Sequence, residues 1–135
     1  MRIVQRCSGF TILELVVVLI ILAVLMTIAT SIYFNYINKA KVTVSISILD
    51  TVSKTLESYL LDNNKYPESI DFTSCVDEQG NVVFISSFCD QIKEDLYSIE
   101  SYSISGTSYI LTARAGDNNH TLLTLAGGVI IQQGN

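Results

Sequence analysis

The feature that most constrains this chain is an uncharged apolar run near its N-terminus. The run from Leu15 to Phe34 contains 20 residues and no charged side chain. At 1.5 Å per residue, a helix of this length spans roughly 30 Å, which matches the hydrocarbon core of a bilayer. A segment in lipid must be helical, because each backbone amide has to find its partner within the segment. The run therefore predicts a membrane-embedded helix.

The remainder of the chain has a different composition, which limits the functions open to it. Of the 13 acidic residues, 12 lie at or after Asp50, and the formal net charge of the chain is −5. The longest local basic group is Lys39 with Lys41, so nucleic acid is not a predicted partner. The single histidine, His120, stands alone, and no glycine-rich phosphate loop occurs. We therefore predict neither an enzyme nor a bound cofactor.

Three interpretations of the apolar run compete, and Glu14 distinguishes them. The run is a plain anchor, an ordinary signal peptide cut after Ala29, or a retained helix that follows a short leader. Glu14 lies five residues after Gly9 and inside the apolar run. Inserting an acidic residue at the middle of a membrane helix costs on the order of 2.5–3.5 kcal/mol of free energy. Its default interpretation is therefore functional. The alternative is an interfacial Glu14 that reaches the water at the headgroups.

The segment around Glu14 carries a resemblance to a known family. Gly9-Phe10-Thr11-Ile12-Leu13-Glu14-Leu15, after a short basic leader and before a long aliphatic helix, resembles the class III signal of type IV pilins and pseudopilins. The resemblance implies that a prepilin peptidase cuts between Gly9 and Phe10 and methylates the new amine of Phe10. It also implies membrane lipid before assembly, an inner-membrane assembly platform, and filament partners that include further copies of the chain and other pilins.

The resemblance also implies a role for Glu14 and Phe10 in subunit assembly. In the family, the glutamate is thought to pair with the N-terminal amine of a neighbouring subunit. An α-amine has a reference pKa of about 7.7–8.0 and is mostly charged at neutral pH, and methylation preserves this charge. Because burying both ions costs several kcal/mol each, we expect the pair to set register more than stability.

The three cysteines fit an exported head domain once the leader is removed. Cleavage after Gly9 removes Cys7 and leaves Cys75 with Cys89, an even number that suits one disulfide in an oxidising compartment. A disulfide loop of about 15 residues is worth about 3 kcal/mol in the chain-entropy picture. A redox-active or metal-binding pair is the alternative, although the spacing is not CxxC. We predict no metal site. Some major pseudopilins hold calcium near their C-terminal loop, and Asp117, Asn118 and Asn119 could supply oxygen ligands there, but a simple turn is favoured.

Hydrophobic periodicity predicts an α+β fold, in which one long N-terminal helix, first transmembrane and then amphipathic, packs on a small antiparallel sheet. Apolar residues recur every three or four positions from Ile37 to Leu60, which continues the helix from Phe10 to about Leu61. The Asn and Pro residues of Asp62–Pro67 then end it. Alternation with period two predicts a hairpin and two further strands. The predicted segments are Tyr97–Ile104, a turn at Ser105-Gly106, Tyr109–Ala113, Thr121–Leu125, a turn at Gly127-Gly128, and Val129–Ile131.

We therefore expect three parts: a cleaved leader (1–9), a transmembrane and filament-core helix (10–35), and the second half of the helix with a disulfide-containing head (36–135). The favoured function is a structural subunit of a periplasmic or extracellular type IV pilus-like filament, anchored in the bacterial inner membrane before assembly. A major-type pseudopilin of a type II secretion system is the alternative. Two further hypotheses are a soluble exported binding domain and an electron-carrying fibre. The latter is based on the aromatic residues along the helix, which are Phe10, Tyr33, Phe34, Tyr36 and Tyr59. The chain also lacks the mid-helix proline of many family members and has Ser31 in that neighbourhood.

Overall fold

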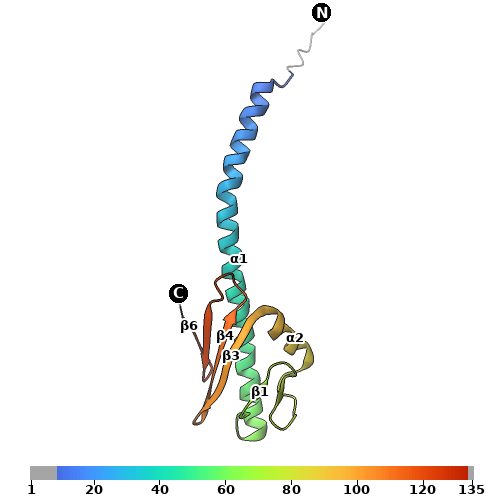
Figure 1. The fold of residues 1–135 in the computed structure, drawn as a ribbon, viewed down its shortest axis with the longest axis vertical. Coiled ribbons are helices and arrows are strands. Elements are labelled where there is room, and N and C mark those ends of the chain that lie inside the picture. Colours follow the sequence, from blue (N-terminus) through green and yellow to red (C-terminus); the bar gives the residue numbers. More distant parts are fainter. Residues whose placement is uncertain (1–8, 134–135) are drawn as a thin grey trace, which may run out of the picture. The chain divides into compact units, whose positions relative to one another are not determined.

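The computed structural model describes residues 9–133, so residues 1–8, with Cys7 and most of the predicted leader, lie outside the described residues. The chain divides into two compact units between Tyr36 and Ile37, and helix α1 contributes to both. The fold is α+β, as predicted (Figure 1). Its elements are α1 (Ile12–Asn63), β1 (Ile70–Asp71), β2 (Val76–Asp77), α2 (Ser86–Asp95), β3 (Leu96–Ser105), β4 (Ser108–Ala115), β5 (Leu122–Ala126) and β6 (Val129–Gln133).

The first unit is the apolar part of α1, and its side chains are exposed from residue 9 to residue 36. Within the described residues, α1 is the one helix long and apolar enough to cross a membrane. The hydroxyls of Thr27 and Thr30 donate to the carbonyls of Ala23 and Met26, at 2.9 and 2.8 Å. Because these bonds satisfy the hydroxyls inside the helix, the surface of the unit remains apolar.

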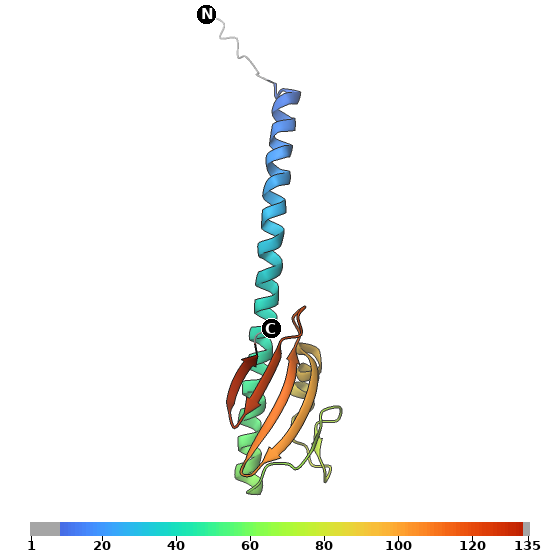
Figure 2. The same cartoon turned by 60° about the vertical axis from the view of Figure 1, so that its left-hand side comes forward.

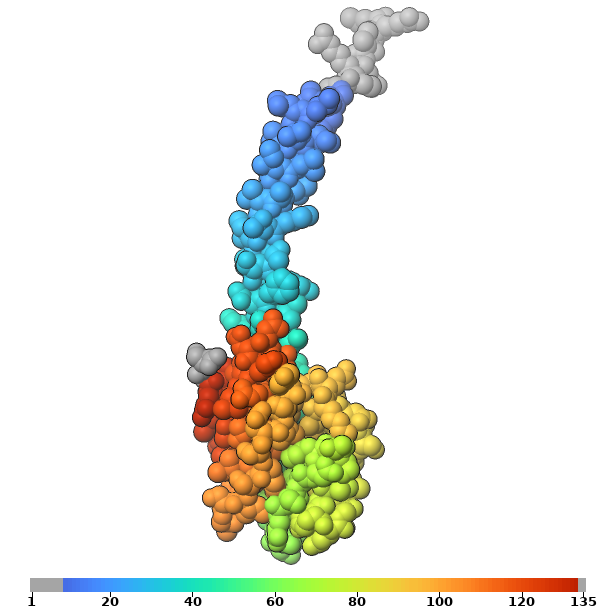
Figure 3. All heavy atoms as spheres, in the orientation of Figure 1, coloured from blue at the N-terminus to red at the C-terminus, as the bar shows by residue number. Residues whose placement is uncertain are grey.

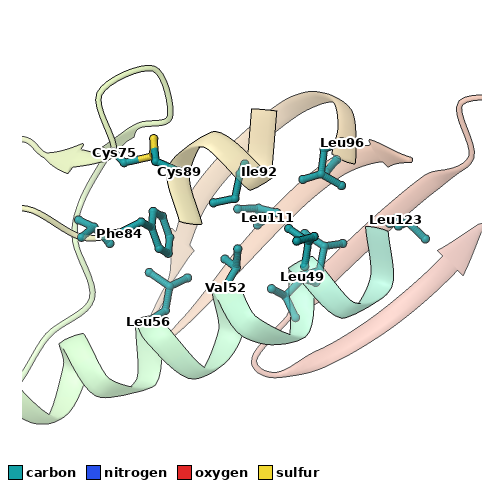
Figure 4. Packing of buried hydrophobic residues seen from close by; sticks show 14 of the residues in the cluster. Leu49, Val52, Leu56, Cys75, Phe84, Cys89, Ile92, Leu96, Leu111 and Leu123 are labelled. Atoms are coloured by element: carbon teal, nitrogen blue, oxygen red, sulfur yellow. A yellow bond between two sulfur atoms is a disulfide. The ribbon is translucent and has the colours of Figure 1, made fainter. Parts of the chain in front are cut away.

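The second unit, which we call the head, is built on residues 37–63 of α1. Leu49, Val52 and Leu56 of this helix are almost fully buried and form the centre of the core (Figure 4). The buried face also includes Ser45 and Ser53, which the apolar periodicity did not predict. Each has a partner: Ser45 donates to the carbonyl of Asp95, and Tyr109 donates to the hydroxyl of Ser53. Paired hydroxyls at these positions are compatible with burial.

A four-stranded antiparallel sheet with the order β3-β4-β5-β6 covers α1 in the head (Figure 2). Its inner face buries alternate residues of β4 and β5, among them Tyr109, Leu111 and Leu123. In the space-filling view, the sheet and the loop between α1 and α2 hide most of α1 within the head (Figure 3). The predicted strands are confirmed to within a few residues, and Gly127 and Gly128, both at positive φ, form the turn between β5 and β6 as expected.

The ends of α1 differ slightly from the prediction. The helix begins at Ile12 instead of Phe10, because Thr11 caps its first turn. It ends at Asn63 instead of about Leu61, and Asn64 then adopts the left-handed conformation with a φ of 58°. The amide of Asn64 donates to the carbonyl of Leu60 at 2.8 Å, which closes the helix end. The prediction that asparagine would terminate this helix is confirmed.

Helix α2 was not predicted; it begins in the last four residues of the disulfide loop and continues beyond Cys89 to Asp95. The helix follows Ile85, which supplies no side-chain cap, so no start signal marks it in the sequence. Cys89 and Ile92 are its buried residues, and they anchor it on the core. The two-residue strands β1 and β2 and the irregular register of β3 were also not predicted.

Asp77 organises the turn that follows β2. Its buried carboxylate accepts hydrogen bonds from the amides of Gln79 and Asn81, the side chain of Asn81, and the hydroxyl of Tyr59. Burial by itself raises the pKa of Asp77, but these hydrogen bonds outweigh burial and lower the pKa well below its usual range. The same contact raises the pKa of Tyr59 to about 12. Asp77 therefore ties this turn to α1.

We expect Asp77→Asn to destabilise the head at pH 7 and to change its acid sensitivity. A carboxyl group whose pKa is lowered by folding contributes stability above the unfolded pKa of about 3.9 and loses it as the pH falls further. The difference in thermal midpoint between wild type and Asp77→Asn should therefore be largest at pH 7 and shrink towards pH 2. Near-ultraviolet circular dichroism of the tyrosines measures it, with the exposed Asp50→Asn as control. An equal difference at both pH values would contradict this role.

Candidate functional site

The start of α1 forms the candidate processing and assembly site. Thr11 caps the helix: the amide of Glu14 donates to its hydroxyl at 3.3 Å, and the amide of Leu15 donates to its carbonyl at 3.2 Å. Thr11-Ile12-Leu13-Glu14 thus has the spacing of a capping box, a signal that the sequence analysis did not use. An acidic residue in the first turn also interacts favourably with the helix dipole. Glu14 therefore has a local structural role besides the predicted one.

Glu14 is nevertheless free to meet a second molecule. Glu14 is exposed, and none of the ion pairs found among residues 9–133 involves its carboxylate. It lies among apolar side chains that are exposed as well, including Leu13 and Leu15. A carboxylate in such a surface needs a cationic partner once the surface is removed from water. No such partner is found among the described residues 9–133.

Gly9 and Phe10 precede the helix in an accessible position. A Cβ at Gly9 would meet no atom within 4 Å, and the backbone there is not in the left-handed region. The fold therefore gives no reason of its own for a glycine at this position. Phe10 is 72% exposed, so the bond between the two residues is open to a peptidase. The predicted roles of Gly9 in cleavage and of Phe10 in methylation and assembly remain predictions.

The aromatic residues behind the electron-transfer hypothesis have different surroundings within their own units. The rings of Tyr33 and Phe34 lie edge to face, with centroids 6.1 Å apart. Tyr36 is exposed. Tyr59 lies in the head, where its hydroxyl donates to Asp77 at 2.7 Å. The hydroxyl of Tyr59 therefore contributes to the stability of the head.

Cys75 and Cys89 are joined by a disulfide in the head, with their Cα atoms 6.0 Å apart. Both residues are buried, and they adjoin the core near Phe84 and Ile92 (Figure 4). The bond ties the chain before β2 to α2. A buried disulfide of this kind supports a structural role, because redox-active cysteines need access to a partner thiol.

Asp117 serves a turn in this structure. Its carboxylate accepts hydrogen bonds from both the amide and the hydroxyl of Thr121, each at 2.8 Å. Burial acts to raise the pKa of Asp117, and the bonds from Thr121 outweigh it and lower the pKa. In the described part of the chain, no group of three or more histidine, cysteine, aspartate or glutamate side chains is placed to hold a metal ion. The hydrogen bonds of Asp117 with Thr121 agree with the turn that the sequence favoured.

Comparison with known proteins relates the candidate site to a described motif. Residues 4–30 match the family described as "Prokaryotic N-terminal methylation motif". The chain is 36% identical over 63 residues to the type II secretion system core protein G of Aeromonas hydrophila, which covers 47% of this chain and 44% of that protein. It is 36% identical over 65 residues to the protein of the same name from Pseudomonas aeruginosa, covering 48% of this chain and 46% of the relative. The similarity thus spans less than half the length of these relatives. No solved structure gave a significant match.

Proposed function

We propose that the chain is the structural subunit of a pilus-like filament, held in the bacterial inner membrane by α1 before assembly. The observation that carries this proposal is the apolar first part of α1, which is exposed from residue 9 to residue 36, begins at Ile12 shortly after Gly9-Phe10, and has Glu14 as the acidic residue of its first turn. The match to the N-terminal methylation motif supports cleavage and methylation at this place. In this proposal, residues 1–9 form the leader, residues 10–35 the membrane and filament-core helix, and residues 36–135 the remaining helix and the head.

The proposed mechanism follows from the chemistry of the helix start. Cleavage before Phe10 creates a cationic amine, and Glu14 supplies an anion four residues later. When apolar helices pack side by side in a filament, both charges leave water, and each needs an opposite charge. The amine of one subunit and Glu14 of its neighbour satisfy this need together. Because only one relative position of the helices brings them into contact, the pair fixes the register of assembly.

The second candidate is a pseudopilin of a type II secretion system. The similarity to two proteins named type II secretion system core protein G favours it. Both candidates use the same processing and the same helix packing, and they differ in the machine that the filament serves. Deletion of the chain in its host separates them: loss of surface filaments supports the pilus, and retention of secreted proteins in the periplasm supports the pseudopilus.

The mass of the mature N-terminus tests the shared part of the proposal. We expect protein purified from assembled filaments to begin at Phe10 and to carry a methyl group on its amine. Gly9→Val should leave residues 1–9 in place, because a β-branched side chain replaces the residue that the peptidase is proposed to recognise. The matched control is Ser8→Ala, which changes the neighbouring leader residue and should be processed normally. A start near Thr30, or assembled protein that keeps Met1 to Gly9, would contradict the proposal.

A further inference from the structure

The loop between β4 and β5 contains an acceptor sequence for N-linked sugars. In Asn119-His120-Thr121, an asparagine is followed two residues later by a threonine, and the residue between them is not proline. None of the other seven asparagines in the sequence is followed by serine or threonine at this spacing. Because so short a pattern also occurs by chance, the placement of Asn119 in the fold decides what it means.

Asn119 lies in a tight turn at the surface of the head. The amide of His120 donates to the carbonyl of Asp117 at 3.1 Å, so Asn118 and Asn119 are the two central residues of a β-turn. Both asparagines are exposed. The loop that contains them is orange-red in the space-filling view and lies on the surface of the head (Figure 3). A sugar on the side chain of Asn119 therefore has room outside the head.

The fold gives no reason of its own for an asparagine at position 119. The residue does not have a positive φ, the backbone conformation in which asparagine is enriched. No side-chain hydrogen bond found among residues 9–133 involves it. Other asparagines do serve the structure: Asn64 ends α1 at a φ of 58°, and the side chain of Asn81 donates to Asp77 at 2.9 Å. The side-chain nitrogen of Asn119 is thus available for reaction.

The residues around Asn119 hold the loop closed without its side chain. The amide and the hydroxyl of Thr121 both donate to the carboxylate of Asp117, each at 2.8 Å. The ring of His120 stacks on the ring of Tyr97, with centroids 3.7 Å apart. These contacts involve the neighbours of Asn119 on both sides. A sugar on Asn119 therefore leaves the contacts that shape the loop in place.

The hydroxyl of Thr121 indicates when a sugar is added. A transferase that distinguishes this pattern from others must contact the hydroxyl two residues after the asparagine. In the folded head that hydroxyl is bound to Asp117, which is 3% exposed. The hydroxyl is free before the loop closes, so transfer takes place on the exported chain before the head folds. Folding then leaves the modified side chain outside the core.

We propose that Asn119 is a site of N-linked glycosylation, with an oligosaccharide on a lipid pyrophosphate as the donor. The side-chain nitrogen of Asn119 forms a bond to the anomeric carbon of the first sugar. The bond from that carbon to the phosphate oxygen breaks, its electron pair stays on the lipid pyrophosphate, and the nitrogen loses a proton to a base of the transferase. The inference goes beyond the proposed function and rests on it only in requiring export of the head, because such acceptor sequences are used in secreted proteins.

Mass analysis of the mature chain tests this proposal. Protein from assembled filaments of the host is digested, and its peptides are fragmented by electron transfer, which keeps a sugar on its side chain. We expect the peptide with Asn119 to exceed its sequence mass by at least one sugar residue, located on Asn119. Asn119→Gln should lose all of this additional mass. The matched control Asn118→Gln changes the adjacent exposed residue of the turn, which lacks the threonine, and should keep it.

Two variants of Thr121 test whether the pattern itself is read. Thr121→Ser keeps a hydroxyl two residues after Asn119 and should keep the sugar. Thr121→Val has a similar size but no hydroxyl, and it should lose the sugar although Asn119 is unchanged. Because transfer precedes folding, weaker closure of the loop in Thr121→Val does not by itself prevent it. A sugar retained on Asn119 in Thr121→Val would contradict the proposal.

The same samples separate this inference from the proposed function. A mature chain that begins at Phe10 and carries an unmodified Asn119 would overturn the glycosylation and leave the filament function intact. Additional mass located on Asn118, or on a serine or threonine, would also overturn it. Assembled protein that keeps Met1 to Gly9 and carries the sugar on Asn119 would overturn the proposed processing and leave this inference standing.

Discussion

Glu14→Gln should be processed and inserted normally but should reduce filament yield by roughly tenfold or more. Glutamine keeps the size of the side chain and still suits the third position of the capping box that Thr11 begins. It removes the negative charge that the neighbouring N-terminal amine needs. Removing one partner of a desolvated ion pair typically costs about 3–5 kcal/mol. Because this free energy is lost at every contact between neighbouring subunits, polymerisation should be strongly weakened. Electron microscopy and the filament fraction after shearing measure the yield.

The capping variant Thr11→Ala separates the two roles of Glu14. It removes the hydroxyl that accepts the Glu14 amide, at a cost of about 0.5–2 kcal/mol to the helix start, but leaves the charge in place. If the charge matters for assembly, Thr11→Ala retains most filaments and Glu14→Gln does not. Normal filament yield from Glu14→Gln would show that Glu14 acts as a helix cap and would remove the proposed ion pair.

Replacing both Cys75 and Cys89 with alanine should produce the largest loss of stability in the head. A disulfide that closes a loop of about 15 residues contributes about 3 kcal/mol through the chain entropy of the unfolded state. For a head of this size, such a loss lowers the thermal midpoint by roughly 10–20 °C. Near-ultraviolet circular dichroism of the full-length protein in detergent reports this change, because Tyr109 and Tyr102 lie in the head core or pack against it.

Two controls accompany the cysteine variant. Wild type that is unfolded in denaturant, reduced with excess dithiothreitol and refolded under reducing conditions should show the same lowered midpoint, since it lacks the same cross-link. Val82→Ala, at an exposed position of the same loop, should keep the wild-type midpoint because it removes little buried surface. An unchanged midpoint in the double alanine variant would mean that α2 and β2 are held in place by core packing without the disulfide.

The predictions from sequence succeeded where a local pattern is strong. The uncharged run from Leu15 to Phe34 requires a helix in lipid whatever the rest of the chain does. The β5–β6 hairpin was equally clear, because Gly127-Gly128 supplies the positive φ angles of a tight turn between two alternating segments. Helix α2 has no side-chain cap at its start and is only ten residues long, so no strong local pattern marks it in the sequence.

What the sequence by itself determined is the division into an apolar helix and an acidic head, together with the motif from Gly9 to Leu15. These features depend on neighbouring residues, whose solvent preference and spacing can be read along the chain. Only the tertiary structure decided that Ser45 and Ser53 are buried, that Asp77 reaches Tyr59, and that α2 packs on the core. Each of these depends on contacts between segments far apart in sequence, and the burial and pairing of a polar side chain are fixed only when those segments pack.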